Sequence, residues 1–223
     1  LLPQATESRP QDICRIVSEA YFHTGDYAKA LGYMENYAEL GGEMGREELY
    51  LTGYCNYVAG NYDRAIEQLS KVASGGDEWA QNASYHLGDC YLQTGDKQRA
   101  MSAFALAASA DFDQAIREES MFNYGKLQYE LDRGGFNAAI TTLDNYIKTY
   151  PDSPRVDEAR EILLAAYFNS RNYDAAYEAI RQLDDPDNNV KMALQKIVYF
   201  RALECFEAGD YDQALALFDV ADQ

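Results

Sequence analysis

The feature that most constrains the fold of this 223-residue chain is a short phrase that recurs six times. The phrase joins a turn-forming pair such as Gly-Asp to an aromatic residue in most copies and to an alanine three positions later. The copies are "GDYAKA" (25–30), "GNYDRA" (60–65), "GDKQRA" (95–100), "GGFNAA" (134–139), "RNYDAA" (171–176) and "GDYDQA" (209–214). Their third residues are 35, 35, 39, 37 and 38 positions apart. A period of this length indicates a stack of similar structural units.

Helical periodicity flanks the phrase on both sides. After the second copy, apolar residues recur at Ile66, Leu69 and Val72, and this spacing fits one face of a helix and not a strand. A Gly-Asp or Gly-Asn pair fits a tight turn, because Gly readily adopts positive φ and Asp or Asn caps the next helix. The alanine places a small side chain where two helices cross. Each unit is therefore predicted to be a helix-turn-helix, and the chain to be all-α.

The third unit carries the fullest version of the pattern. It reads Leu87-Gly88-x-x-Tyr91, then Gly95-Asp96, then Ala100-x-x-x-Phe104, then Ala107. This pattern resembles the tetratricopeptide repeat. The resemblance covers residues 11 to 222 and implies a right-handed α-solenoid of about six repeats, near 11–42, 46–77, 80–111, 116–151, 155–188 and 191–222. Residues 1–223 are predicted to form one solenoid domain, as a fragment of a longer chain.

The last predicted helix, Tyr211 to Asp222, has no successor. It carries Leu215, Phe218 and Val220, and the apolar side of a repeat is normally covered by the next repeat. We therefore expect a further segment of the protein, or a second copy in a homo-oligomer, to cover this helix.

The resemblance also implies that the first helix of each pair faces a concave groove. Carried over to this chain, one row of groove residues is Tyr50, Tyr85, Phe122 and Tyr199, a second row is Phe22, Tyr57, Tyr129, Phe168 and Phe206, and Tyr54 lies between them. The polar groove residues are Arg15, Glu19, Asp89, Glu119, Lys126, Glu130, Glu158, Glu161 and Lys196. Such a groove is suited to a peptide, a helix or a sugar chain, because aromatic rings give a large contact area at low entropic cost. The alternative is that the rings pack on one another and thicken the wall of the solenoid.

The charge balance narrows the range of partners. The formal net charge is −18, which repels phosphate backbones and disfavours nucleic acid as a partner. An acidic surface is commonly a solubilising one, and it also suits a basic protein partner, whose association would weaken with salt. No apolar run reaches the ~18 residues needed to span a bilayer.

A cluster in "HLGDC" (86–90) has the spacing of a catalytic or metal-binding group. His86 and Cys90 lie four residues apart, as neighbours on one helix face, with Asp89 beside them. However, Cys55 occupies the same repeat position as Cys90, 35 residues earlier, so that position is interpreted as a small packing site. With no HExxH, phosphate loop or GxSxG pattern either, the chain is predicted to be non-catalytic, without metal or cofactor.

Three functions remain open at this stage. The first is an interaction scaffold that binds a protein or peptide, the second a carbohydrate-handling accessory module, and the third a recruiting region of a larger enzyme. The clamp that grips chaperone carboxylates is not expected, because its first two positions hold Arg15 and Glu19. The segment "YPDSP" (150–154) is similar to a linker phrase of bacterial envelope tetratricopeptide proteins, including BamD-like and Tol-Pal-associated ones. This similarity favours the periplasm or cell envelope, with the cytoplasm as the alternative.

Overall fold

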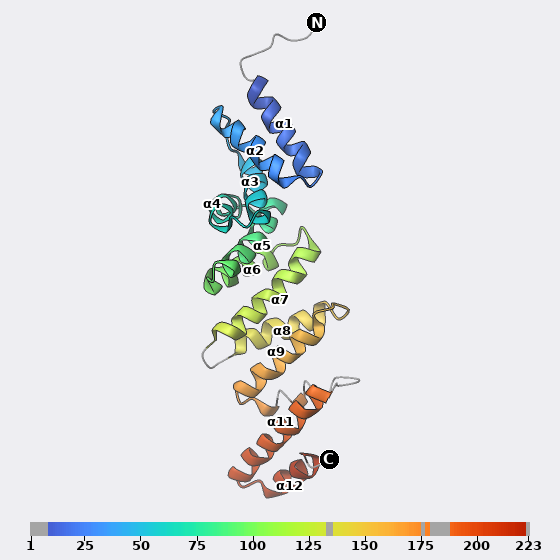
Figure 1. Ribbon diagram of the computed structural model, residues 1–223. Coiled ribbons are helices and arrows are strands. Elements are labelled where there is room, and N and C mark those ends of the chain that lie inside the picture. The colour runs from blue at the N-terminus through green and yellow to red at the C-terminus, as the bar shows by residue number, and fades with distance from the viewer. Residues whose placement is uncertain (1–8, 133–135, 175–176, 179–187, 222–223) are drawn as a thin grey trace. The chain divides into compact units, whose positions relative to one another are not determined.

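The computed structural model describes residues 9–132, 136–174, 177–178 and 188–221 (Figure 1). Every regular element in these ranges is an α-helix, so the all-α prediction is confirmed. Internal contacts divide the chain into two compact units, residues 1–124 and 125–223. The prediction that the repeats act as one domain stays a prediction.

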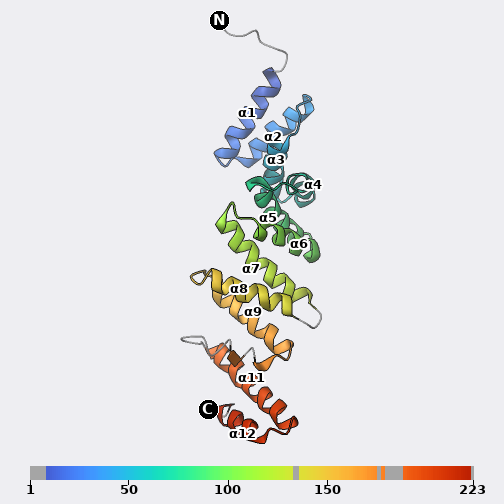
Figure 2. The ribbon, with the colours of Figure 1, turned by 180° about the vertical axis from the view of Figure 1, so that it is seen from behind.

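The first unit consists of stacked helix pairs, which Figures 1 and 2 show in chain order. The pairs are α1 (Arg9–His23) with α2 (Tyr27–Glu39), α3 (Arg46–Val58) with α4 (Tyr62–Val72), and α5 (Glu78–Gln93) with α6 (Lys97–Ser109), followed by the start of α7 (Gln114–Leu131). Helix α2 contacts α3, α4 contacts α5, and α3 also contacts α1 and α5. The first helices therefore lie beside one another along one side of this unit.

The turns inside the pairs have the geometry that the recurring phrase predicts. Gly25, Gly60 and Gly95 have φ of 80°, 77° and 81°, the left-handed region that favours glycine. The carboxylate of Asp96 then accepts a hydrogen bond from the backbone N–H of Arg99 at 2.9 Å, which caps α6. The glycine part of the turn prediction is confirmed in these three turns. The capping part is confirmed at Asp26 and Asp96, whereas Asn61 makes no side-chain cap hydrogen bond.

Small residues let the two helices of a pair approach closely. The final alanines of the phrase that lie in described residues are 0–1% exposed, namely Ala30, Ala65, Ala100, Ala139 and Ala214. The alanine of the fifth copy, Ala176, lies outside the described residues. Gly88 in α5 leaves even less space, since a Cβ there would lie 2.6 Å from the fully buried ring of Phe104 in α6. Residues with larger side chains at these positions would push the helices apart.

The connection from α6 to α7 is held by one buried amide. Gln81 of α5 is 2% exposed, and its Nε2 donates to the carbonyl oxygens of Ala107, Ala110 and Asp113 at 3.2, 3.2 and 3.1 Å. Its Oε1 accepts from the backbone N–H groups of Phe112 and Asp113 at 3.1 and 2.7 Å. These bonds satisfy the carbonyl of Ala107 at the end of α6 and tie down backbone groups of the loop from 110 to 113.

The second unit continues with the end of α7, then α8 (Asn137–Thr149), α9 (Val156–Asn169), α11 (Asn188–Glu207) and α12 (Tyr211–Ala221). Contacts join α8 to α9, α9 to α11 and α11 to α12. Two of its turns use residues other than glycine at positive φ, Phe136 at 53° and Arg171 at 56°. Both therefore adopt a conformation that is costly for a residue with a Cβ.

The last described helix presents an apolar side to solvent. In α12, Leu215 is 63% and Val220 46% exposed, whereas Phe218 is half-buried and its ring centroid lies 5.8 Å from that of Tyr199. This exposure agrees with the expectation of an uncovered face. Its covering by a further segment or a second copy stays a prediction.

Candidate functional site

The first unit contains a groove of about 440 Å³ along its row of first helices. Its lining comes from α1, the first residue of α2, α3 and α5, and consists of Phe22, Tyr27, Tyr50, Tyr54, Glu78, Trp79, Asn82 and His86. Six of these eight side chains are aromatic or imidazole rings. Three predicted groove residues, Phe22, Tyr50 and Tyr54, lie in it.

Tyr54 stands at the centre of the ring cluster. Its ring centroid is 5.4 Å from that of Phe22, 5.3 Å from Tyr27 and 4.9 Å from His86, each in an edge-to-face arrangement, and such pairs are favoured by the ring quadrupoles. The rings therefore support one another as well as line the groove. This packing agrees with the alternative in which the rings form the wall, and their role in binding a partner stays a prediction.

The rim of the groove is formed by Trp79. This side chain is 42% exposed, and its ring lies edge-to-face on Tyr50 with centroids 4.8 Å apart. Tyr50 itself is only 8% exposed, and burial raises the pKa of its hydroxyl. Trp79 is thus partly open to solvent while the buried Tyr50 packs against it.

Sequence reasoning missed five of the eight groove residues, namely Tyr27, Glu78, Trp79, Asn82 and His86. The third repeat was predicted to begin at residue 80, whereas α5 begins at Glu78, with Asp77 as its N-cap accepting from the N–H of Ala80 at 2.9 Å. The "GGDE" segment before Trp79 was a signal that could have placed the helix start earlier, because Gly-Gly followed by Asp is typical of a capped helix beginning.

His86, Asp89 and Cys90 are not arranged for catalysis. Burial lowers the pKa of His86 to about 4, and its Nδ1 has no hydrogen-bond partner among the described residues. Asp89 instead accepts a hydrogen bond from the hydroxyl of Tyr57 at 3.1 Å, while burial raises its pKa. Cys90 is fully buried with its pKa raised to about 12, as is the pKa of Cys55. Both thiols are unpaired and protonated at neutral pH, so they serve as packing groups.

His86 lies differently from what its sequence position suggested. It was not among the predicted groove residues, but its ring contacts those of Tyr54 and Tyr57, both with centroids 4.9 Å away, and it lines the groove. Because it is neutral at pH 7, it contributes a ring and not a charge. The rings that it contacts belong to α3, so its place in the groove could not be predicted from the sequence of α5 alone.

Two other predicted groove residues of the first unit are packed within the fold. Phe122 is 0% exposed, so its ring packs inside the fold and is not open to a partner. Tyr85 is half-buried, with its ring centroid 6.0 Å from that of Phe104 in α6. The row of groove positions carried over from the resemblance therefore includes residues that turn toward the paired helix.

The predicted residues of the second unit have varied surroundings. Lys126 pairs with Glu158 at 2.7 Å, and the hydroxyl of Tyr129 accepts from Asn169 Nδ2 at 3.0 Å. Exposed rings are presented by Tyr199 and Phe206, which are 47% and 55% exposed.

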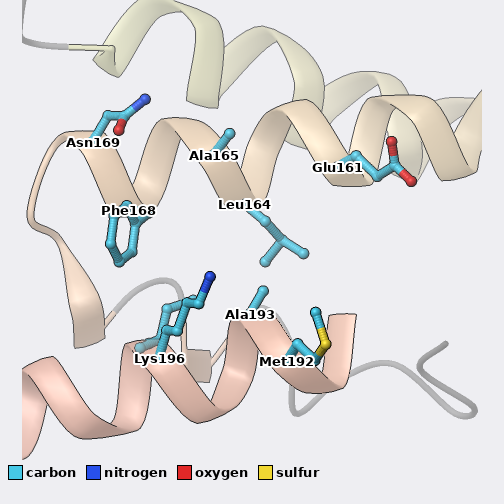
Figure 3. A pocket seen from close by; sticks show the side chains of 9 residues that line it. Glu161, Leu164, Ala165, Phe168, Asn169, Met192, Ala193 and Lys196 are labelled. Carbon is cyan, nitrogen blue, oxygen red and sulfur yellow. The ribbon is translucent and has the colours of Figure 1, made fainter. Parts of the chain in front are cut away.

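Phe168 lines a second pocket, of about 340 Å³, between α9 and α11. Figure 3 shows Leu164 and Phe168 pointing from α9 toward α11, with Ala193 and Met192 opposite them. Glu161, Asn169 and Lys196 provide the polar edge, and Ala165 and Ile197 complete the lining. Glu161, Phe168 and Lys196 were predicted as groove residues, and the structure brings them to one pocket.

The described ranges give two further findings, one on metal ions and one on membranes. In these residues no three or more His, Cys, Asp or Glu side chains are grouped so that they could hold a metal ion. None of the helices described is both long and apolar enough to cross a membrane.

Stacked helix pairs with a groove along their first helices define a helical-repeat solenoid protein. Models of known protein families identify which kind of helical repeat this is. One model of the tetratricopeptide repeat matches residues 58–118 and another matches residues 18–81 and 124–189. The chain belongs to the tetratricopeptide repeat family, whose repeats generally mediate protein–protein interaction and are typically non-catalytic.

Solved structures agree on the fold. A MamA protein is similar with a TM-score of 0.58 and 19% identity, over 78% of this chain and 90% of that one. A tetratricopeptide repeat protein from Parabacteroides merdae gives 0.53 and 13%, over 96% and 93%. The C-terminal part of a repeat-containing protein from Cytophaga hutchinsonii gives 0.52 and 16%, over 92% and 76%. No curated protein matches the sequence.

Proposed function

We propose that this chain is a non-catalytic scaffold that binds a peptide or protein partner through the aromatic groove of its first unit. The observation that carries the proposal is the groove of about 440 Å³ across the first helices of three successive repeats. Tetratricopeptide repeats generally mediate protein–protein interaction, and this groove is the surface of the unit with clustered, partly open rings.

The physical support lies in how the rings are held. Tyr54 contacts rings on both sides along the row, and Tyr50 supports Trp79 from below. A partner therefore meets side chains that are already ordered, so little further conformational entropy is lost on binding. Buried or half-buried Tyr and Trp residues are the types that most often dominate binding energy at protein interfaces.

The second unit offers a separate contact. The pocket between α9 and α11 has an apolar floor that includes Leu164 and Ala193 and a polar edge with Glu161 and Lys196 (Figure 3). This combination suits one aliphatic or aromatic side chain of a protein partner, because the floor excludes water and the edge provides hydrogen bonds.

Selection from a library of random displayed peptides tests the proposal. Enriched peptides are synthesised, and their affinities are measured by calorimetry for the wild type, Trp79→Ala and a matched control, Phe112→Ala. Phe112 is also an exposed ring, at 56%, but lies outside the groove. We expect binding to weaken about tenfold or more in Trp79→Ala and to stay unchanged in the control. Failure to enrich any peptide, or equal binding to all three proteins, would contradict the proposal.

We also propose a bacterial envelope assembly as the setting. The support is the linker phrase "YPDSP" at 150–154, in which Ser153 accepts or donates a hydrogen bond with the hydroxyl of Tyr146 at 2.7 Å. Fractionation of cells expressing the full protein tests this setting, and recovery in the cytoplasm alone would count against it.

A further inference from the structure

The rim of the aromatic groove carries an unpaired negative charge. Glu78 lines the groove in the first turn of α5, and no Lys or Arg in the described part of the chain forms an ion pair with it. The nearby Arg46 is engaged elsewhere, because its guanidinium bonds to both carboxylate oxygens of Asp77 and to the carbonyl of Val72. Glu78 is therefore available to a ligand.

The rings around this carboxylate also favour a positive charge. Aromatic faces attract cations electrostatically when the charge lies within ~6 Å of the ring centroid, most strongly for Trp. Trp79 is the only tryptophan of the chain and is 42% exposed at the rim, next to Glu78 and above Tyr50. His86, at the other end of the groove, does not oppose a cation, since burial keeps it neutral at pH 7.

We propose that this groove receives an arginine side chain of the partner protein, with its guanidinium stacked on Trp79 and paired with Glu78. This inference rests on the proposed function and specifies the chemistry that the groove recognises. The net charge of −18 attracts a basic partner over longer distances, which raises the rate of association at low salt.

Arginine fits this surface better than other residues. Its guanidinium is planar, stacks on rings, is weakly hydrated and presents paired donors to a carboxylate, whereas the ammonium of lysine is a compact, strongly hydrated charge. An acidic side chain or a C-terminal carboxylate would be repelled by Glu78. A neutral sugar could stack on Trp79 but would leave Glu78 unpaired.

The single tryptophan allows a test that needs no known partner. Acetyl-arginine methylamide is titrated at constant ionic strength while Trp79 emission is followed, and acetyl-citrulline methylamide serves as the uncharged probe of the same shape. We expect the arginine probe to bind at least about tenfold more tightly than the citrulline probe. Glu78→Gln should abolish most of this preference.

Glu47→Gln is the matched control. Glu47 is likewise an exposed residue in the first turn of its helix, α3, but does not line the groove, so the arginine preference should persist. Equal binding of the two probes, or a preference that survives Glu78→Gln, would overturn the inference. If Glu78→Gln does not fold, the comparison of the two probes on the wild type decides the matter.

The displayed peptides separate this inference from the proposed function. Peptides that depend on Trp79 but bind equally well with citrulline in place of arginine would leave the groove as a binding site and remove the arginine assignment. Peptides that lose about tenfold in affinity on that replacement support both.

Discussion

Replacing Gln81 by Glu tests how this chain fixes the path from α6 to α7. The wild-type amide nitrogen donates to three backbone carbonyls, at 3.1–3.2 Å, and the side chain is 2% exposed. A carboxylate has the same shape but is only an acceptor, so it would face three carbonyl oxygens without a proton to share. Its hydrogen bonds from the N–H groups of Phe112 and Asp113 would persist, because a carboxylate oxygen still accepts them.

The expected cost follows from these contacts. A buried polar group without its partner costs about 1–3 kcal/mol, and more if it is charged. With three acceptors affected and a charge placed against them, we expect Gln81→Glu to lower the free energy of unfolding by about 3 kcal/mol or more at pH 7. This is a large part of the ~5–15 kcal/mol that stabilises a typical domain.

Urea denaturation followed by far-UV circular dichroism measures this cost. Gln93→Glu is the control, because Gln93 is exposed at the end of the same helix and should change stability by less than about 0.5 kcal/mol. The difference between Gln81→Glu and wild type should also shrink as the pH falls below the raised pKa of the buried carboxyl, and the shrinkage should be complete near pH 4, the ordinary pKa of Glu. A buried carboxyl has a raised pKa, so its penalty appears as the pH rises and disappears on protonation.

An equal urea midpoint for Gln81→Glu, Gln93→Glu and wild type at pH 7 would refute this reasoning. It would mean that the loop from 110 to 113 does not depend on the amide donor, and that the three hydrogen bonds donated by Gln81 add little to stability.

Other features of the fold give further expectations. Gly88→Ala should lower the free energy of unfolding by about 1–3 kcal/mol, because the added methyl group would clash with Phe104. Gly32 is also helical but has open space around it, so Gly32→Ala should raise the free energy of unfolding by up to about 1 kcal/mol. Thermal melts of the two variants and the wild type measure both effects. Burial lowers the folded pKa of His86 to about 4 from 6.5, so the unfolded chain binds the proton more readily. Stability should therefore fall by up to about 3 kcal/mol between pH 6.5 and 4, and urea midpoints across this range should show a smaller slope in His86→Phe. Cys90, with a pKa near 12, should react with a thiol reagent at neutral pH only in urea; fast native labelling, located by peptide mass mapping, would contradict its packing role.

The sequence by itself determined the repeating unit of this protein. The turn at Gly95 and Asp96, the cap on α6 and the buried Ala100 each depend on residues within a few positions of one another. Steric freedom at glycine, side-chain capping and helical period are local properties. They can be read without knowing the neighbours in space, which is why the all-α fold and its family were predictable.

Only the tertiary structure decided which side chains form the groove. Trp79 and Glu78 join it because α5 begins two residues before the predicted repeat and packs beside α3. Phe122 was predicted to line the groove, at the same repeat position as Tyr85, but it is fully buried. The buried role of Gln81 likewise depends on a loop about 30 residues away. An earlier helix start adds side chains to the first turn of α5, and the packing of α5 beside α3 places them at the groove. The repeat pattern alone therefore does not determine the binding surface.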